Sequence, residues 1–124
     1  MTMRTEQLGR IGERLAERCL RAAGLIILDR RWQATGGHLR GELDLVCRDG
    51  AEVVVCEVKT RRRAEPWEAA AAVDAAKLRQ LRRLGLQWLA ERDWVAKPLR
   101  IDVVAVAWPR EGGRAVLEHL RGVG

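Results

Sequence analysis

The chain has 124 residues, a length that supports one hydrophobic core and is too short for two. Hydrophobic residues make up 48% and charged residues 32%, which excludes an intrinsically disordered chain, so we predict one domain over residues 1–124. The formal net charge of +6 suits a phosphate-rich partner, although a solvated basic face gives the same charge.

The cysteines and the N-terminus indicate the expected cellular setting. Cys19, Cys47 and Cys56 are odd in number and lie in apolar stretches, so we expect buried thiols rather than disulfides, and a cytoplasmic protein. No stretch resembles a signal peptide or a membrane span, so no membrane association is expected.

The first half of the chain predicts one helix and three strands. Apolar residues recur at helical spacing from Thr5 to Ala23. Strands are expected at 25–32, 41–48 and 52–60, with a loop at 33–40. Asp49 and Gly50 favour a two-residue hairpin turn between the last two strands.

The second half predicts a helix and two further strands. Asp74 is a good N-cap for a helix over 75–92, and strands are expected at 99–108 and 115–120. Because a helix separates the strands at 52–60 and 99–108, these two are able to lie parallel. The sequence thus predicts an α/β fold, a mixed sheet flanked by helices in the order αβββαββ.

The expected hairpin gathers carboxylates on one face. A turn at Asp49-Gly50 sets Asp44 opposite Val55 and diagonal to Glu57. Strand alternation then separates an acidic face from an apolar face that belongs in the core. The first holds Glu42, Asp44, Val53, Val55, Glu57 and Lys59, and the second holds Leu43, Leu45, Cys47, Val54, Cys56 and Val58.

This acidic face suggests a metal site. Asp44 and Glu57 offer oxygen ligands only, which suits Mg²⁺ or Mn²⁺, and Lys59 would neutralise developing charge or activate water. Only three of the 23 basic residues are lysine, so lysine beside Glu57 indicates a requirement that arginine would not meet. Simple cross-strand ion pairs remain an equal alternative.

Other basic and acidic residues allow two interpretations each. Lys77 lies on the apolar stripe of the second helix, where it either has a functional role or extends its head to water. Arg61, Arg62 and Arg63 either grip a phosphate backbone or solubilise a loop. The helical position of Glu13 by itself favours a surface carboxylate.

The order of motifs resembles the YraN-like family of bacterial proteins. The motifs are Gly12-Glu13, the Gly-Glu-Leu-Asp run at 41–44, the Glu-Val-Lys-Thr-Arg run at 57–61, Lys77 and the Arg-Ile-Asp run at 100–102. That family is similar to the restriction-endonuclease-like superfamily, which includes archaeal Holliday-junction resolvases. The resemblance implies that Asp44, Glu57 and Glu13 are metal ligands and catalytic residues, with Lys59 as catalytic lysine. Ala76 and Trp67-Glu68 depart from the family pattern at the expected substrate rim.

The leading hypothesis is therefore a metal-dependent endonuclease that hydrolyses phosphodiester bonds in DNA, including branched or repair intermediates. In it, Arg61, Arg62, Arg63 and Lys77 contact nucleic acid, and Mg²⁺ or Mn²⁺ is the cofactor. The alternatives are a non-catalytic nucleic-acid-binding module with the same fold and a protein-interaction subunit. Nucleases that cut two strands are often homodimers, and no residue of this sequence marks an interface.

Overall fold

The computed structural model describes residues 3–37, 39–95 and 97–124, and these ranges form three helices and five strands. In chain order they are α1 (Thr5–Ala22), β1 (Ile26–Gln33), β2 (Glu42–Asp49), β3 (Glu52–Arg61), α2 (Pro66–Ala70), α3 (Ala75–Ala90), β4 (Leu99–Ala107) and β5 (Val116–Leu120). Predicted boundaries lie within two residues of these. The short helix α2 was not predicted, because five residues carry no helical periodicity, so the order is αβββααββ.

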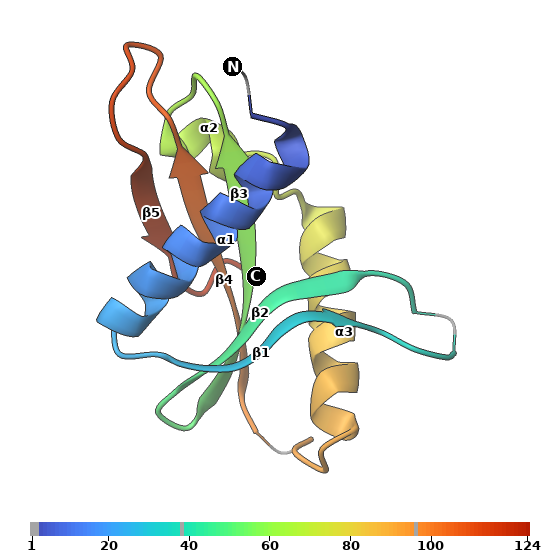
Figure 1. Ribbon diagram of the computed structural model, residues 1–124. Coiled ribbons are helices and arrows are strands. Elements are labelled where there is room, and N and C mark those ends of the chain that lie inside the picture. The colour runs from blue at the N-terminus through green and yellow to red at the C-terminus, as the bar shows by residue number, and fades with distance from the viewer. Residues whose placement is uncertain (1–2, 38, 96) are drawn as a thin grey trace.

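The strands form one mixed sheet in the order β1-β2-β3-β4-β5 (Figure 1). β3 and β4 are parallel, as predicted from the helix between them, and the other neighbours are antiparallel. The α/β class with a mixed sheet flanked by helices is confirmed, and the architecture is compatible with a restriction-endonuclease-like fold. None of the helices in the described ranges is long and apolar enough to cross a membrane.

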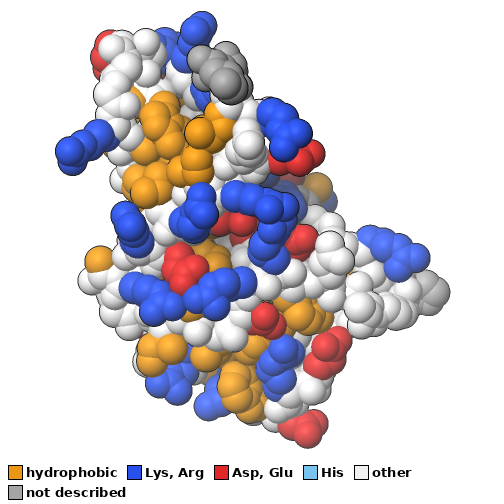
Figure 2. Space-filling model, in the orientation of Figure 1, with side chains coloured by type: hydrophobic (Ala, Val, Ile, Leu, Met, Phe, Trp, Pro, Cys, Tyr) orange, Lys and Arg blue, Asp and Glu red, His pale blue; other side chains and the backbone are white. Residues whose placement is uncertain are grey.

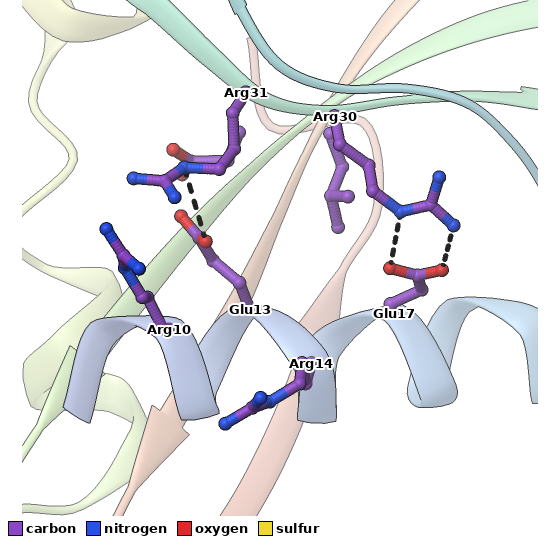
Figure 3. A pocket seen from close by; sticks show the side chains of 8 residues that line it. Arg10, Glu13, Arg14, Glu17, Arg30 and Arg31 are labelled. Atoms are coloured by element: carbon purple, nitrogen blue, oxygen red, sulfur yellow. Dashed lines mark hydrogen bonds and ion pairs between the residues drawn. The ribbon is translucent and has the colours of Figure 1, made fainter. Parts of the chain in front are cut away.

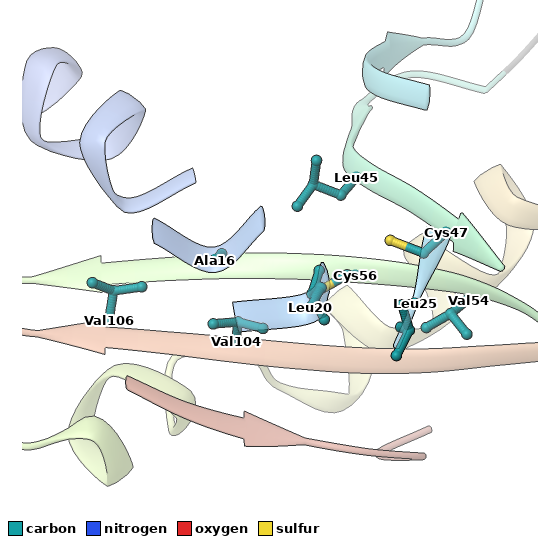
Figure 4. Close-up of a cluster of buried hydrophobic side chains, with 9 residues drawn as sticks. All are labelled: Ala16, Leu20, Leu25, Leu45, Cys47, Val54, Cys56, Val104 and Val106. Atoms are coloured by element: carbon teal, nitrogen blue, oxygen red, sulfur yellow. The ribbon is translucent and has the colours of Figure 1, made fainter. Parts of the chain in front are cut away.

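Helices cover both faces of the sheet. α1 packs on one face, where Ala16 and Leu20 contact a buried cluster drawn from β2, β3 and β4 (Figure 4). α3 packs on the other face, where Leu81, Leu84 and Trp88 join a second buried cluster. Asp74 caps α3 as predicted, since its carboxylate accepts the backbone N–H of Lys77 at 2.8 Å.

The hairpin turn lies one residue later in the chain than predicted. Asp49 pairs with Glu52, so the two loop residues are Gly50 and Ala51, and Val46 pairs with Val55 instead of Val53. Of these two loop residues, only Gly50 takes the left-handed conformation, with φ of 60°. Since the shift changes the pairing by two residues, the side chains of the paired residues, 45–49 and 52–56, keep their predicted sides of the strands.

The division into an acidic and an apolar face was only partly right. Val53 and Val55, which share a face with Glu57, are buried under α3, so that face is also part of the core. Leu43 joins the same cluster instead of the α1 cluster. A central strand with a helix on each side is apolar on both faces, and Asp44 and Glu57 lie beyond this apolar part, away from the hairpin turn.

Candidate functional site

The candidate site lies where the pairing of β2 with β3 ends. The last paired residues are Leu45 and Cys56. If the pairing continued in the same register, Asp44 would lie opposite Glu57. The Asp44 carboxylate instead accepts the backbone N–H of Val58 at 2.8 Å. Asp44 thus replaces a strand hydrogen bond, and its side chain is fixed to β3.

A close approach of α1 to β3 brings Glu13 to this end of the sheet. Gly12 is buried against Thr60, and a Cβ atom at position 12 would overlap Thr60 Oγ1 and lie 3.1 Å from Thr60 Cβ. Only glycine permits this distance between helix and strand. The next residue, Glu13, therefore extends over β2 instead of into solvent.

Glu13, Glu42 and Asp44 form an acidic trio. Each offers a carboxylate oxygen, and these oxygens all lie within 4.8 Å of one another. Glu13 and Asp44 were predicted for one site, and the structure brings them together. Glu42 was placed on the acidic face but given no role; its spacing of two from Asp44 on one strand is the signal that points to it.

The trio concentrates negative charge in a partly buried place. Burial, and then the negative charge of Glu57, raises the pKa of Asp44 to about 8. Burial also raises the pKa of Glu13, the charge of Glu42 adds to this, and Arg31 opposes it. These carboxylates are thus short of compensating positive charge.

Glu57 is buried beside the trio and faces two lysines. Its Oε2 lies 3.3 Å from Lys59 Nζ and 3.5 Å from Lys77 Nζ, and its side chain is 5% exposed. Lys77 of α3 therefore directs its ammonium at Glu57, and its functional role stays a prediction. Glu57 is outside the trio, and its predicted role as a metal ligand stays a prediction.

Residues 12–106 match the uncharacterised protein family UPF0102. The chain belongs to this family. It is the YraN family that the motifs resemble. A UPF0102 protein of Frankia alni is 49% identical over 123 residues, which cover 98% of each chain. A UPF0102 protein of Beutenbergia cavernae is 49% identical over 119 residues, which cover 96% of this chain and 97% of the relative.

The UPF0102 match contains the whole candidate site. It begins at Gly12, next to Glu13, and extends past Lys77 to Val106. A Streptomyces coelicolor member, 45% identical over 118 residues, covers 94% of this chain. Family membership thus applies to the site-bearing elements together.

Arginines line a hollow beside the trio, between α1 and β1. Figure 3 shows Arg30 and Arg31 extending from β1 onto α1, where they meet Glu17 and Glu13. The same hollow is lined by Arg10, Arg14 and Asp44. On the molecular surface, Lys and Arg side chains gather around a few carboxylates on the face that carries α1 (Figure 2).

The predicted basic run, residues 61–63, begins at a second hollow that Glu13 also lines. Arg61, the last residue of β3, lines this hollow with Glu13, Lys59 and Thr60. Arg62 donates to the backbone oxygen of Met3, which ties the run to the start of α1. Arg61, Arg62 and Arg63 are all exposed, and their contact with nucleic acid stays a prediction.

Proposed function

We propose that this UPF0102 protein is a metal-dependent nuclease that hydrolyses phosphodiester bonds in DNA. The observation that carries the proposal is the convergence of three carboxylates from α1 and β2, beside a buried Glu57 that contacts Lys59. Carboxylates with a neighbouring lysine and an arginine-rich surface suit a reaction on a phosphate ester.

The chemistry of the donor set fits Mg²⁺ or Mn²⁺. Glu13, Glu42 and Asp44 supply oxygen atoms only, and their spacing within 4.8 Å suits a hard cation shared between carboxylates. The raised pKa of Asp44 supports the fit, because a cation would compensate the charge that burial and Glu57 disfavour. When bound there, the cation would polarise a phosphate oxygen and acidify a coordinated water.

The protein side chains have distinct roles in this proposal. Asp44, Glu13 and Glu42 would hold the cation, while Glu57 orients the ammonium of Lys59 by the contact at 3.3 Å. Lys59 lines the same hollow as Thr60 and Arg61, where its ammonium would contact the phosphate or the attacking water. Its positive charge would stabilise the charge that develops on the phosphate oxygens.

Cleavage assays test the assignment. Wild type, Asp44→Asn and Lys59→Met are compared on linear duplex, four-way-junction and single-stranded DNA with Mg²⁺ or Mn²⁺. Each variant is expected to lose about 10²- to 10⁴-fold in rate. Glu118→Gln, an exposed carboxylate change on the edge strand β5, serves as control and should cut like wild type. Equal cleavage by wild type, Asp44→Asn and Lys59→Met refutes the catalytic assignment.

A non-catalytic nucleic-acid-binding module is the second candidate. It is favoured by the pairing of Glu57 with both Lys59 and Lys77, which leaves that carboxylate compensated without any cation. Salt-sensitive DNA binding that EDTA does not change, with no cleavage product, would establish it.

A further inference from the structure

Two adjacent arginines on β1 point to the same helix, which a regular strand does not allow. Arg30 pairs with Leu45 and Trp32 with Leu43, so Arg31 lies inside the strand. Arg31 has φ of 49°, in the left-handed region that residues with a side chain rarely adopt. With this local distortion the Arg31 side chain also extends to the α1 side, where it lies over Glu13 while Arg30 lies over Glu17 (Figure 3). Backbone strain of this kind is retained when the surrounding structure or a function requires it.

The two arginines are held in different ways. Arg30 hydrogen-bonds both oxygens of Glu17, with Nε at 3.0 Å from Oε2. Arg31 Nε lies 3.9 Å from Glu13 and 3.8 Å from Glu42, beyond hydrogen-bond distance from either. Arg30 is therefore committed to a structural pair, whereas Arg31 is a loosely held counter-ion of the acidic trio.

The hollow beside Arg31 has further positive charge. Arg10 and Arg14, one turn apart on α1, line it, and neither forms an ion pair with a residue in the described ranges. Asp44 lies in the lining of the same hollow, so an anion bound there would be close to the trio. One guanidinium group can donate to two phosphate oxygens at once. A phosphate of nucleic acid is therefore the ligand that suits this hollow.

We propose that this hollow binds a phosphate of the DNA strand next to the bond to be cleaved, and that Arg31 exchanges the carboxylates for that phosphate when a divalent cation binds. The proposal rests on the proposed function, because it assigns the cation to Glu13, Glu42 and Asp44. The carboxylates alone attract the Arg31 guanidinium, whereas a cation bound among their oxygens would repel it. Arg31 then extends to the phosphate, so cation and DNA strengthen each other's binding.

Arg31→Gly tests the exchange without threatening the fold. Glycine adopts φ of 49° without strain, so the variant should be at least as stable as wild type while lacking the guanidinium. The probe is a short fluorescein-labelled DNA duplex, titrated by anisotropy in EDTA and in Ca²⁺. Wild type should bind more tightly in Ca²⁺, and Arg31→Gly should lose about tenfold of that gain, the effect of one charge-assisted contact.

A matched control and a second measurement complete the experiment. Arg79→Gln removes an exposed arginine from α3 and should keep the Ca²⁺-dependent gain, with only a smaller salt dependence. Calorimetry without DNA should show that Arg31→Gly binds Mn²⁺ more tightly than wild type, because the competing guanidinium is gone.

The outcomes separate this proposal from the proposed function. Failure of wild type to bind any divalent cation overturns the proposed metal site and the exchange with it. Cation binding that Asp44→Asn abolishes, together with an undiminished Ca²⁺-dependent gain in Arg31→Gly, overturns only the exchange. Loss of the gain in Arg31→Gly, with the fold intact, supports it.

Discussion

Gly12→Ala should separate α1 from the sheet and dismantle the acidic trio. A methyl group at position 12 would overlap Thr60 Oγ1 and lie 3.1 Å from Thr60 Cβ. Thr60 is β-branched and stiff, so it cannot turn away as a long side chain would. The helix has to move, and Glu13, the next residue, moves with it.

Gly9→Ala supplies the reference for the size of this effect. Gly9 lies one turn earlier on α1, and an added Cβ there meets nothing within 4 Å. Replacing glycine by alanine in a helix stabilises by about 0.5–1 kcal/mol, and both variants share this gain. Overpacking against Thr60 costs about 1–3 kcal/mol, so the two variants should differ by that amount. For a chain of this length the difference corresponds to melting temperatures roughly 4–12 °C apart.

Urea and thermal denaturation measure the stability, and Mn²⁺ calorimetry measures the site. Gly9→Ala should be more stable than wild type and bind the cation normally, whereas Gly12→Ala should be less stable and bind it weakly. Thr60→Ala in the Gly12→Ala background removes Oγ1 and should restore part of both properties. If Gly12→Ala matches Gly9→Ala in stability and cation affinity, the close approach of α1 to β3 does not position Glu13.

Two further predictions concern buried carboxylates. Because burial and Glu57 raise the pKa of Asp44 from 3.8 to about 8, the cation-free folded state keeps a proton that the unfolded chain loses. The free energy of unfolding in EDTA should therefore fall as pH rises from about 4 to about 8, and Asp44→Asn should flatten this slope; an unchanged slope contradicts the assignment. Asp102 is buried and accepts hydrogen bonds from Arg100 at 2.9 Å and from the Gly122 backbone at 3.0 Å. Asp102→Asn should cost about 3 kcal/mol in urea denaturation, against no more than about 0.5 kcal/mol for the exposed Glu118→Gln.

Local signals predicted most of the fold. The helical stripe of α1, the N-cap Asp74 and the β-rich runs each depend on neighbouring residues, and their boundaries are right within two residues. The parallel pairing of β3 with β4 was predictable because chain connectivity restricts it. The turn was not, because Asp49-Gly50 supplies two residues suited to positive φ and is favoured locally, whereas the loop is Gly50-Ala51, with only Gly50 at positive φ. Only the packing of β2 on β3 decides between them.

The candidate site was predictable in its residue types and less so in its grouping. Glu13 and Asp44 meet as expected, whereas Glu57 contacts two lysines and Glu42 takes the third position in the trio. The end of the β2–β3 pairing produces this difference, and no pattern in the sequence marks where a ladder stops. The left-handed conformation of Arg31 was equally hidden, because arginine is not a residue type that favours positive φ.

Asp44 connects the fold and the proposed chemistry in one side chain. Its carboxylate accepts the Val58 N–H at 2.8 Å just beyond the last paired residues of β2 and β3, so it maintains the strand alignment. The same carboxylate belongs to the acidic trio. Alanine at this position would leave the Val58 N–H without its acceptor, and the resulting loss of structure would be mistaken for a loss of chemistry. Asparagine keeps an oxygen acceptor and cannot ionise, so Asp44→Asn separates the two roles.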